Sequence, residues 1–200
     1  MSGKLRLTGS SSGYIELQAA DTANNATLTI PNDGFGGGKI LQLLSSDKTD
    51  TASTTANSDT DITGTDQSGS GSVWCVKITP SATSSKILVL ADISIAGGGE
   101  ARWNLYRDST HIHKGDAATG RVPTTVGGWV GGTNPFWYGA FAMHKSYLDS
   151  PSSTSELTYK IMWYSYTNTA YLNRSGYDYS NSVNHQERTA SSITVMEVGA

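Results

Sequence analysis

The sequence predicts an all-β protein, and three observations support this prediction. Charged residues make up only 16% of the chain, and 22 of its 200 residues are glycine, which is typical of a turn-rich β protein. No apolar i, i+3, i+4, i+7 stripe extends beyond about two turns, so we expect almost no helix. The longest apolar block, SSKILVLADISIA at residues 84–96, is rich in β-branched side chains and alternates with period two. We therefore expect the domain to be built around this strand.

The strand at 84–96 has one fully apolar face and one partly apolar face. The first face consists of Ile87, Val89, Ala91, Ile93 and Ile95. Leu88 and Leu90 lie on the opposite face, before Asp92 and Ser94 turn it polar. A strand that is apolar on both faces has to be covered on both. We expect the first face to fill the interior of a sandwich and Leu88 and Leu90 to contact another protomer.

Residues 1–44 form a predicted N-terminal module of very short strands. Each strand supplies two or three apolar positions, at Leu5 and Leu7, Ile15 and Leu17, Leu28 and Ile30, and Ile40 to Leu44. A segment this small buries no stable core alone, and the single cysteine, Cys75, leaves no internal disulfide to staple it. The remaining route to stability is oligomerisation about a shared axis.

Residues 45–72 admit two interpretations. They contain few apolar side chains, which is typical of a disordered linker. The alternative is an edge strand with its loops, in which the acidic and hydroxyl side chains of residues 59–63 discourage pairing with other edges.

Residues 73–200 form the predicted head domain. Alternating patterns predict strands at 73–80, 84–96, 101–107, 111–114, 157–166, 169–173 and 191–198, with a turn after Leu148. About eight strands at this spacing are expected of an antiparallel sandwich.

Two sets of motifs resemble bacteriophage proteins. GYIELQA (13–19), ATLTIP (26–31) and GGKILQ (37–42) resemble the stem module of tail-fibre proteins, part of a trimeric β-structured shaft. Five further motifs resemble the C-terminal head domain of tail-fibre and other virion proteins: ITPSATSSKILV (78–89), LYRDSTHI (105–112), YLDSP (147–151), LTYK (157–160) and SSITVMEV (191–198). That head is similar to the trimeric jelly roll of the C1q and tumour-necrosis-factor group.

The resemblance implies a homotrimeric virion protein, located in a tail fibre or on the capsid surface, whose stem docks on other virion proteins. The leading expectation is a tail-fibre or spike tip that recognises a host-surface glycan. The alternative is a trimeric capsid decoration protein, a cement protein or head fibre, because most tail fibres carry a longer shaft.

Aromatic loops are the strongest signal for a binding site. Aromatic rings stack on the C–H faces of sugars, while amide and charged groups hydrogen-bond to the hydroxyls. The candidate residues are Trp129, Phe136, Trp137 and Tyr138 in one loop and Asn173, Arg174, Tyr177 and Tyr179 in another. The alternative is that about half of the rings fill the core or a protomer interface.

Other functions find little support. A net charge of −3 offers no basic field for nucleic acid. No Gly-x-Ser-x-Gly nucleophile elbow appears near a plausible base, and the glycine clusters lack the lysine and serine of a phosphate-binding loop, so we expect neither an enzyme nor a cofactor. The start has no apolar signal region, and no apolar run is long enough to cross a bilayer. We expect no membrane insertion.

His111 and His113 have the one metal-like spacing. On a strand, positions i and i+2 share a face, so three copies about an axis would bring six ring nitrogens together for a transition metal. Some trimeric phage fibres use such a pair, but the resemblance does not extend to the His-x-His motif here, because the head domain of that family varies at these positions. The alternative, two exposed histidines without a metal, is the one we adopt.

Overall fold

The computed structural model describes residues 4–8, 14–18, 39–97, 99–129, 139–178 and 186–199. The chain divides into two compact units, Met1–Gly36 and Gly37–Ala200. In the first unit, β1 (Lys4–Thr8) and β2 (Tyr14–Gln18) pair antiparallel, which confirms the first two predicted strands. The strand predicted at Leu28 and Ile30 lies outside the described residues.

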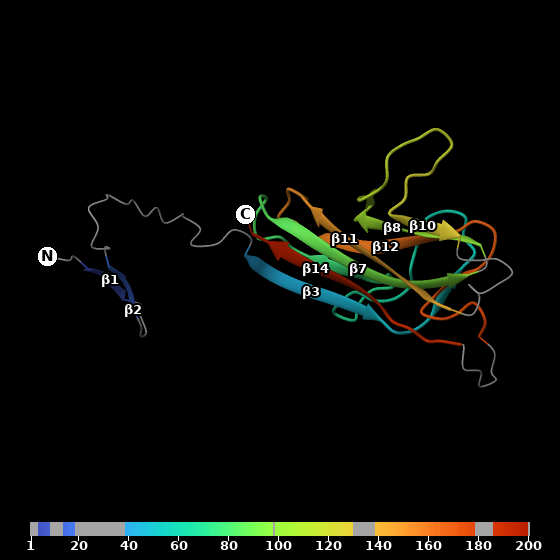
Figure 1. The fold of residues 1–200 in the computed structure, drawn as a ribbon, viewed down its shortest axis with the longest axis horizontal. Helices are drawn as coiled ribbons and strands as arrows, with labels where there is room; N and C mark the ends of the chain where they lie inside the picture. Colours follow the sequence, from blue (N-terminus) through green and yellow to red (C-terminus); the bar gives the residue numbers. More distant parts are fainter. Residues whose placement is uncertain are drawn as a thin grey trace. The chain divides into compact units, whose positions relative to one another are not determined.

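The second unit is an all-β antiparallel sandwich of two sheets (Figure 1). The first, here called the β7 sheet, contains β3 (Ile40–Lys48), β4 (Ala52–Thr54), β7 (Lys86–Gly97), β11 (Phe141–Asp149), β13 (Ala170–Leu172) and β14 (Ser191–Val198). The second, the β12 sheet, contains β5 (Thr60–Asp61), β6 (Cys75–Ile78), β8 (Glu100–Arg107), β9 (Thr110–His111), β10 (Val126–Trp129) and β12 (Leu157–Ser165). In the described part of the chain, no helix is present that could cross a membrane.

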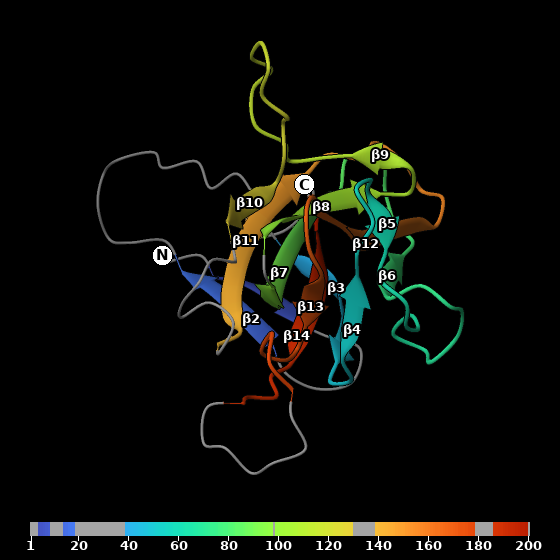
Figure 2. The same cartoon turned by 90° about the vertical axis from the view of Figure 1, so that its right-hand side faces the viewer.

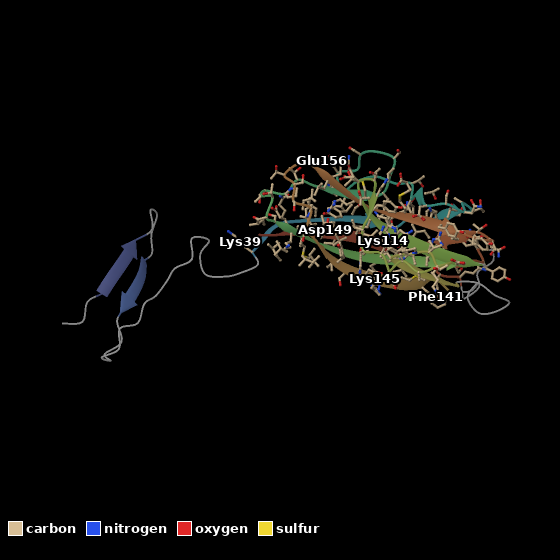
Figure 3. All side chains as sticks on the ribbon, turned by 90° about the horizontal axis from the view of Figure 1, so that it is seen from above. Lys39, Lys114, Phe141, Lys145, Asp149 and Glu156 are labelled. Atoms are coloured by element: carbon tan, nitrogen blue, oxygen red, sulfur yellow. The ribbon has the colours of Figure 1, made fainter. Side chains whose placement is uncertain are left out.

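The connectivity is that of a jelly-roll sandwich. Strands distant in sequence are neighbours in each sheet: β14 lies between β3 and β7, and β12 lies between β8 and the short strands β5 and β6. Such crossing connections between two layers distinguish a jelly roll from a simple meander. Figure 3 shows Phe141, Lys145 and Asp149 following β11 along one side of the sandwich.

The central strand has the predicted inner face. Ile87, Val89, Ala91, Ile93 and Ile95 of β7 are each at most 3% exposed. Opposite them, the β12 sheet contributes Trp103, Leu105, Tyr159, Ile161 and Trp163 to the same core. Trp103 and Trp163 lie opposite each other in adjacent strands. Burying each large apolar side chain contributes roughly 1.5–3 kcal/mol, so this double layer dominates the stability of the unit.

The predicted boundary at residue 44 is wrong. Residues 40–44, predicted as the last strand of the N-terminal module, belong to β3, which pairs along its whole length with β14. The division of the chain into two compact units falls between Gly36 and Gly37 instead. The physical reason is long-range pairing: Ser191 to Val198, at the far end of the chain, supply the ladder for β3.

Residues 45–72 follow the edge-strand alternative. β4 pairs with β13 and β5 pairs with β12, so this segment supplies edges to both sheets. The sandwich therefore starts well before residue 73. The predicted strand at 111–114 is shorter than expected, because β9 ends at His111 and His113 has a positive φ of 49°.

Candidate contact face and surface sites

The outer face of the β7 sheet carries a row of four apolar side chains, one on each of four strands. Leu43 lies opposite Met196, Met196 opposite Leu88, and Leu88 opposite Leu148. Leu43 is 58% exposed and Leu148 is 51% exposed. We call these four residues the apolar row. Leu88, predicted as a protomer contact, lies at the centre of this row. Leu90, the second predicted contact, lies two residues farther along β7 and is 37% exposed.

Exposed apolar side chains also lie at the start of β3. Ile40 and Leu41 are 57% and 41% exposed, and Val198 lies opposite Ile40. Single exposed leucines are normal on protein surfaces, whereas a contiguous apolar patch marks an interaction site. The apolar row has the character of such a site.

The same face becomes polar beyond Leu90. Asp92 lies opposite both Ser192 and His144, and the His144 Nδ1 atom is 3.2 Å from Asp92 Oδ1. A groove here is lined by Leu90, Ala91, Asp92, His144, Lys145, Ser146, Ser192 and Thr194. Serine, histidine and aspartate are the residue types of a hydrolase triad. In such a triad the imidazole is hydrogen-bonded to the hydroxyl of the nucleophilic serine. Among the described residues, no hydroxyl hydrogen-bonds to His144, so the groove has no such arrangement.

Only part of the predicted aromatic site lies in described residues. Phe136, Trp137, Tyr138 and Tyr179 lie outside them. Trp129 ends β10, where its backbone is opposite Glu100, but its side chain is not described. Glycan binding by these rings stays a prediction.

Asn173 is a structural residue, and its prediction as a binding residue is wrong. Its side chain is 0% exposed. The Nδ2 group donates to the carbonyls of Lys48 at 2.7 Å and Asp50 at 3.0 Å, and Oδ1 accepts from Ser191 Oγ at 2.6 Å. The backbone has a φ of 57°, in the left-handed region that asparagine tolerates. Asn173 thus joins the end of β3, β13 and the start of β14.

Arg174 lies in a surface cluster beside this residue. Its guanidinium is 3.9 Å from the ring centroid of Tyr171, and its Nη1 atom is 3.0 Å from Asp178 Oδ2. Arg188 donates two hydrogen bonds to the same carboxylate, at 2.6 and 2.8 Å. Tyr177 is half-buried, and its carbonyl accepts a hydrogen bond from Ser175. Stacked aromatic and cationic groups of this kind suit a polar ligand such as a sugar.

The histidine pair does not form the expected face. His111 stacks on Tyr106 with ring centroids 5.2 Å apart, and its Nε2 atom is 3.3 Å from Thr125 Oγ1. His113 stacks on Tyr147 at 4.6 Å, on the other sheet. The rings separate because the strand ends at His111 and the left-handed backbone at His113 breaks the alternation. Within the described ranges, no group of three or more histidine, cysteine, aspartate or glutamate side chains could hold a metal ion.

A hairpin at residues 114–122 projects from the β12 sheet, and every residue in it is exposed (Figure 2). Its base is fixed by Asn104, whose Oδ1 accepts from Thr124 Oγ1 at 2.6 Å and from the Thr125 amide at 3.0 Å. Asn104 Nδ2 and the Tyr106 hydroxyl both donate to Asp59 Oδ2. Burial and the hydrogen bond to Asp59 raise the pKa of Tyr106 to about 12, so the Tyr106 hydroxyl keeps its proton at neutral pH and remains a donor to Asp59.

No protein-family model and no curated protein matches this sequence.

Proposed function

We propose that this chain is a structural protein of a bacteriophage virion, a homotrimeric tail-fibre or spike tip that recognises a host-surface glycan. The placement of the five head-domain motifs supports the proposal. They fall on the β6–β7 turn, β8 with β9, the end of β11, the start of β12, and β14. Motifs scattered over the sequence thus meet in one jelly-roll sandwich, the fold that the resemblance implies.

The apolar row is the single observation that supports the proposal most. In one protomer it leaves Leu43 and Leu148 more than half exposed, next to Leu88 and Met196 on the same face. Removing apolar surface from water contributes about 25 cal/mol per Å², so this face gains stability when it is covered. Closed symmetric assemblies of identical chains are the common way to cover such a face.

The glycan part of the proposal rests on the cluster around Arg174. Tyr171 offers an aromatic face, while Arg174, Arg188 and Asp178 offer donors and acceptors for sugar hydroxyls. We expect Arg174→Ala to weaken attachment to host cells. Arg121→Ala, an exposed arginine on the projecting hairpin, is the matched control and should bind as the unchanged protein does.

Adsorption and copy number together test this function. The purified protein should bind host cells and block adsorption of the phage, and labelled protein should be located in the tail at a few tens of copies per particle. Protein that neither binds cells nor blocks adsorption contradicts receptor recognition. Hundreds of copies on the shell would establish the alternative, a capsid decoration protein.

A further inference from the structure

A second groove lies on the outer face of the β12 sheet, on the opposite side of the sandwich from the apolar row. It has a volume of about 260 Å³, several times the roughly 30 Å³ that a water molecule occupies in the liquid. Its lining residues are Ser70, Gly71, Ser72, Val73, Cys75, Lys77, Thr158 and Lys160. In the strand register, Lys77 lies opposite Thr158 and Lys160 opposite Cys75, so both lysines belong to the outward face.

One wall of the groove is a loop that is firmly attached to β6. The Gln67 side chain accepts from the Lys77 amide and donates to the Lys77 carbonyl, both at 2.9 Å, as a neighbouring strand would. Within the loop, Asp66 Oδ1 accepts from the Ser68 amide, the Ser68 hydroxyl and the Ser70 amide. The wall is therefore ordered before any ligand arrives, which lowers the entropic cost of binding.

The lysines are held in place but keep free donors. Lys77 Nζ is 3.2 Å from Asp66 Oδ2, and Lys160 Nζ is 2.7 Å from Asp61 Oδ1. Each ammonium group has three N–H donors, so an ion pair with one carboxylate leaves others available. Hydrogen bonds from Ser68 and Ser70 hold the pKa of Asp66 well below its usual range. Asp66 therefore stays ionised, and its ion pair holds Lys77, which lines the groove, in place.

We propose that this groove binds an oxyanion carried by the host-surface glycan, the carboxylate of an acidic sugar or a phosphate group. This inference rests on the proposed glycan recognition. Lys77 and Lys160 supply the charge, and the hydroxyls of Ser70, Ser72 and Thr158 supply further donors. Because the groove and the apolar row are on opposite faces of the sandwich, protomer contacts through the apolar row leave the groove open.

Titrations of the full chain, followed by the amide chemical shifts of an isotope-labelled sample, test the proposal. The anionic probes are glucuronate and glycerol 3-phosphate, and glucose and glycerol are their neutral counterparts. At least one anion should cause saturable shifts at Ser72, Lys77 and Lys160 that weaken with added salt, while the neutral probes cause none. The anion that binds more tightly identifies the source, carboxylate or phosphate.

Variants make the test specific. Lys77→Gln and Lys160→Gln should each weaken anion binding by about tenfold, as expected for the loss of one charge-assisted hydrogen bond. Ser72→Ala, which changes no ion pair, should weaken it less and serves as a second probe if a lysine variant is poorly folded. Lys114→Gln, on the exposed hairpin, is the control and should bind as the unchanged chain does.

The outcomes separate this inference from the proposed function. No saturable shift with either anion, or equal binding by the lysine variants and the unchanged chain, overturns the oxyanion site. If the unchanged chain still attaches to host cells in that case, glycan recognition stands without this groove. If anions bind in the groove but the protein attaches to no cell, the site stands and host recognition fails.

Discussion

Leu88 of β7 and Leu148 of β11 lie directly opposite each other on the outer face of the sandwich, and neither belongs to the buried core. With Met196 and Leu43 they form an apolar row that a single chain leaves in water. We infer that this row is the contact between protomers.

Leu88→Asp should dissociate the assembly and leave the fold of each chain intact. A carboxylate in the middle of an apolar contact loses its hydration without gaining a partner, which is costly. The expected result is a single-chain mass by light scattering with an unchanged β-sheet circular dichroism spectrum. Val122→Asp, a change at a 63% exposed position on the hairpin, should keep the assembly. Unfolding of Leu88→Asp would instead place this side chain in the core.

Asn173→Ala should destabilise the sandwich by about 2–4 kcal/mol, because it leaves the partners of three hydrogen bonds, two of them buried, unpaired. Chemical denaturation followed by circular dichroism measures the change. Asn173→Gly keeps a residue that tolerates positive φ, so it separates the backbone contribution from the lost bonds. Thr119→Ala, at an exposed hairpin position, should have little effect. A small loss in Asn173→Ala would show that these bonds are not needed.

The free energy of unfolding should decrease with rising pH above about pH 10. Burial and a 2.7 Å hydrogen bond to Asp149 raise the pKa of Tyr159, so the folded chain keeps this proton when the unfolded chain, with a pKa near 10, has lost it. The contribution of Tyr159 to the free energy of unfolding is therefore fully present below about pH 10. Above that pH it declines by about 1.4 kcal/mol per pH unit.

Tyr159→Phe provides the comparison for this pH dependence. The variant removes the titrating group, so denaturation between pH 9 and 11 should show a shallower decline. The slope rather than the absolute stability is the readout, because the variant also loses the hydrogen bond to Asp149. Equal slopes in both proteins would contradict the role given to Tyr159.

Cys75 should react slowly with thiol reagents in the folded chain. The side chain is 4% exposed, and burial raises the pKa of its thiol, which reduces the reactive thiolate. Gln67→Ala removes the two bonds that attach the neighbouring loop to Lys77 and should speed the reaction without unfolding the sandwich. Rapid, complete labelling of the unchanged protein would contradict the burial of Cys75.

The local pattern was sufficient to predict the central strand. Ile87 to Ile95 alternate so strongly that one face had to be interior, and the exposed face of Leu88 and Leu90 followed from the same alternation. The edge strands of residues 45–72 were predicted as one of two alternatives, because polar composition alone does not separate an edge from a linker.

Features that depend on distant partners were not accessible from local patterns. The assignment of Ile40–Lys48 to the sandwich depends on β14, at the other end of the chain. The role of Asn173 depends on the carbonyls of Lys48 and Asp50 and on a left-handed backbone, neither of which composition reveals. The divergence of His111 and His113 depends on where β9 ends.

The mass of the purified protein in solution tests the central claim most directly. Light scattering coupled to size exclusion at micromolar concentrations should give the mass of three chains of 21.2 kDa each. This mass should persist on dilution until the protein concentration approaches the dissociation constant of the trimer, because association follows mass action. A stable mass of one chain at every concentration would contradict the trimer and the role given to the apolar row.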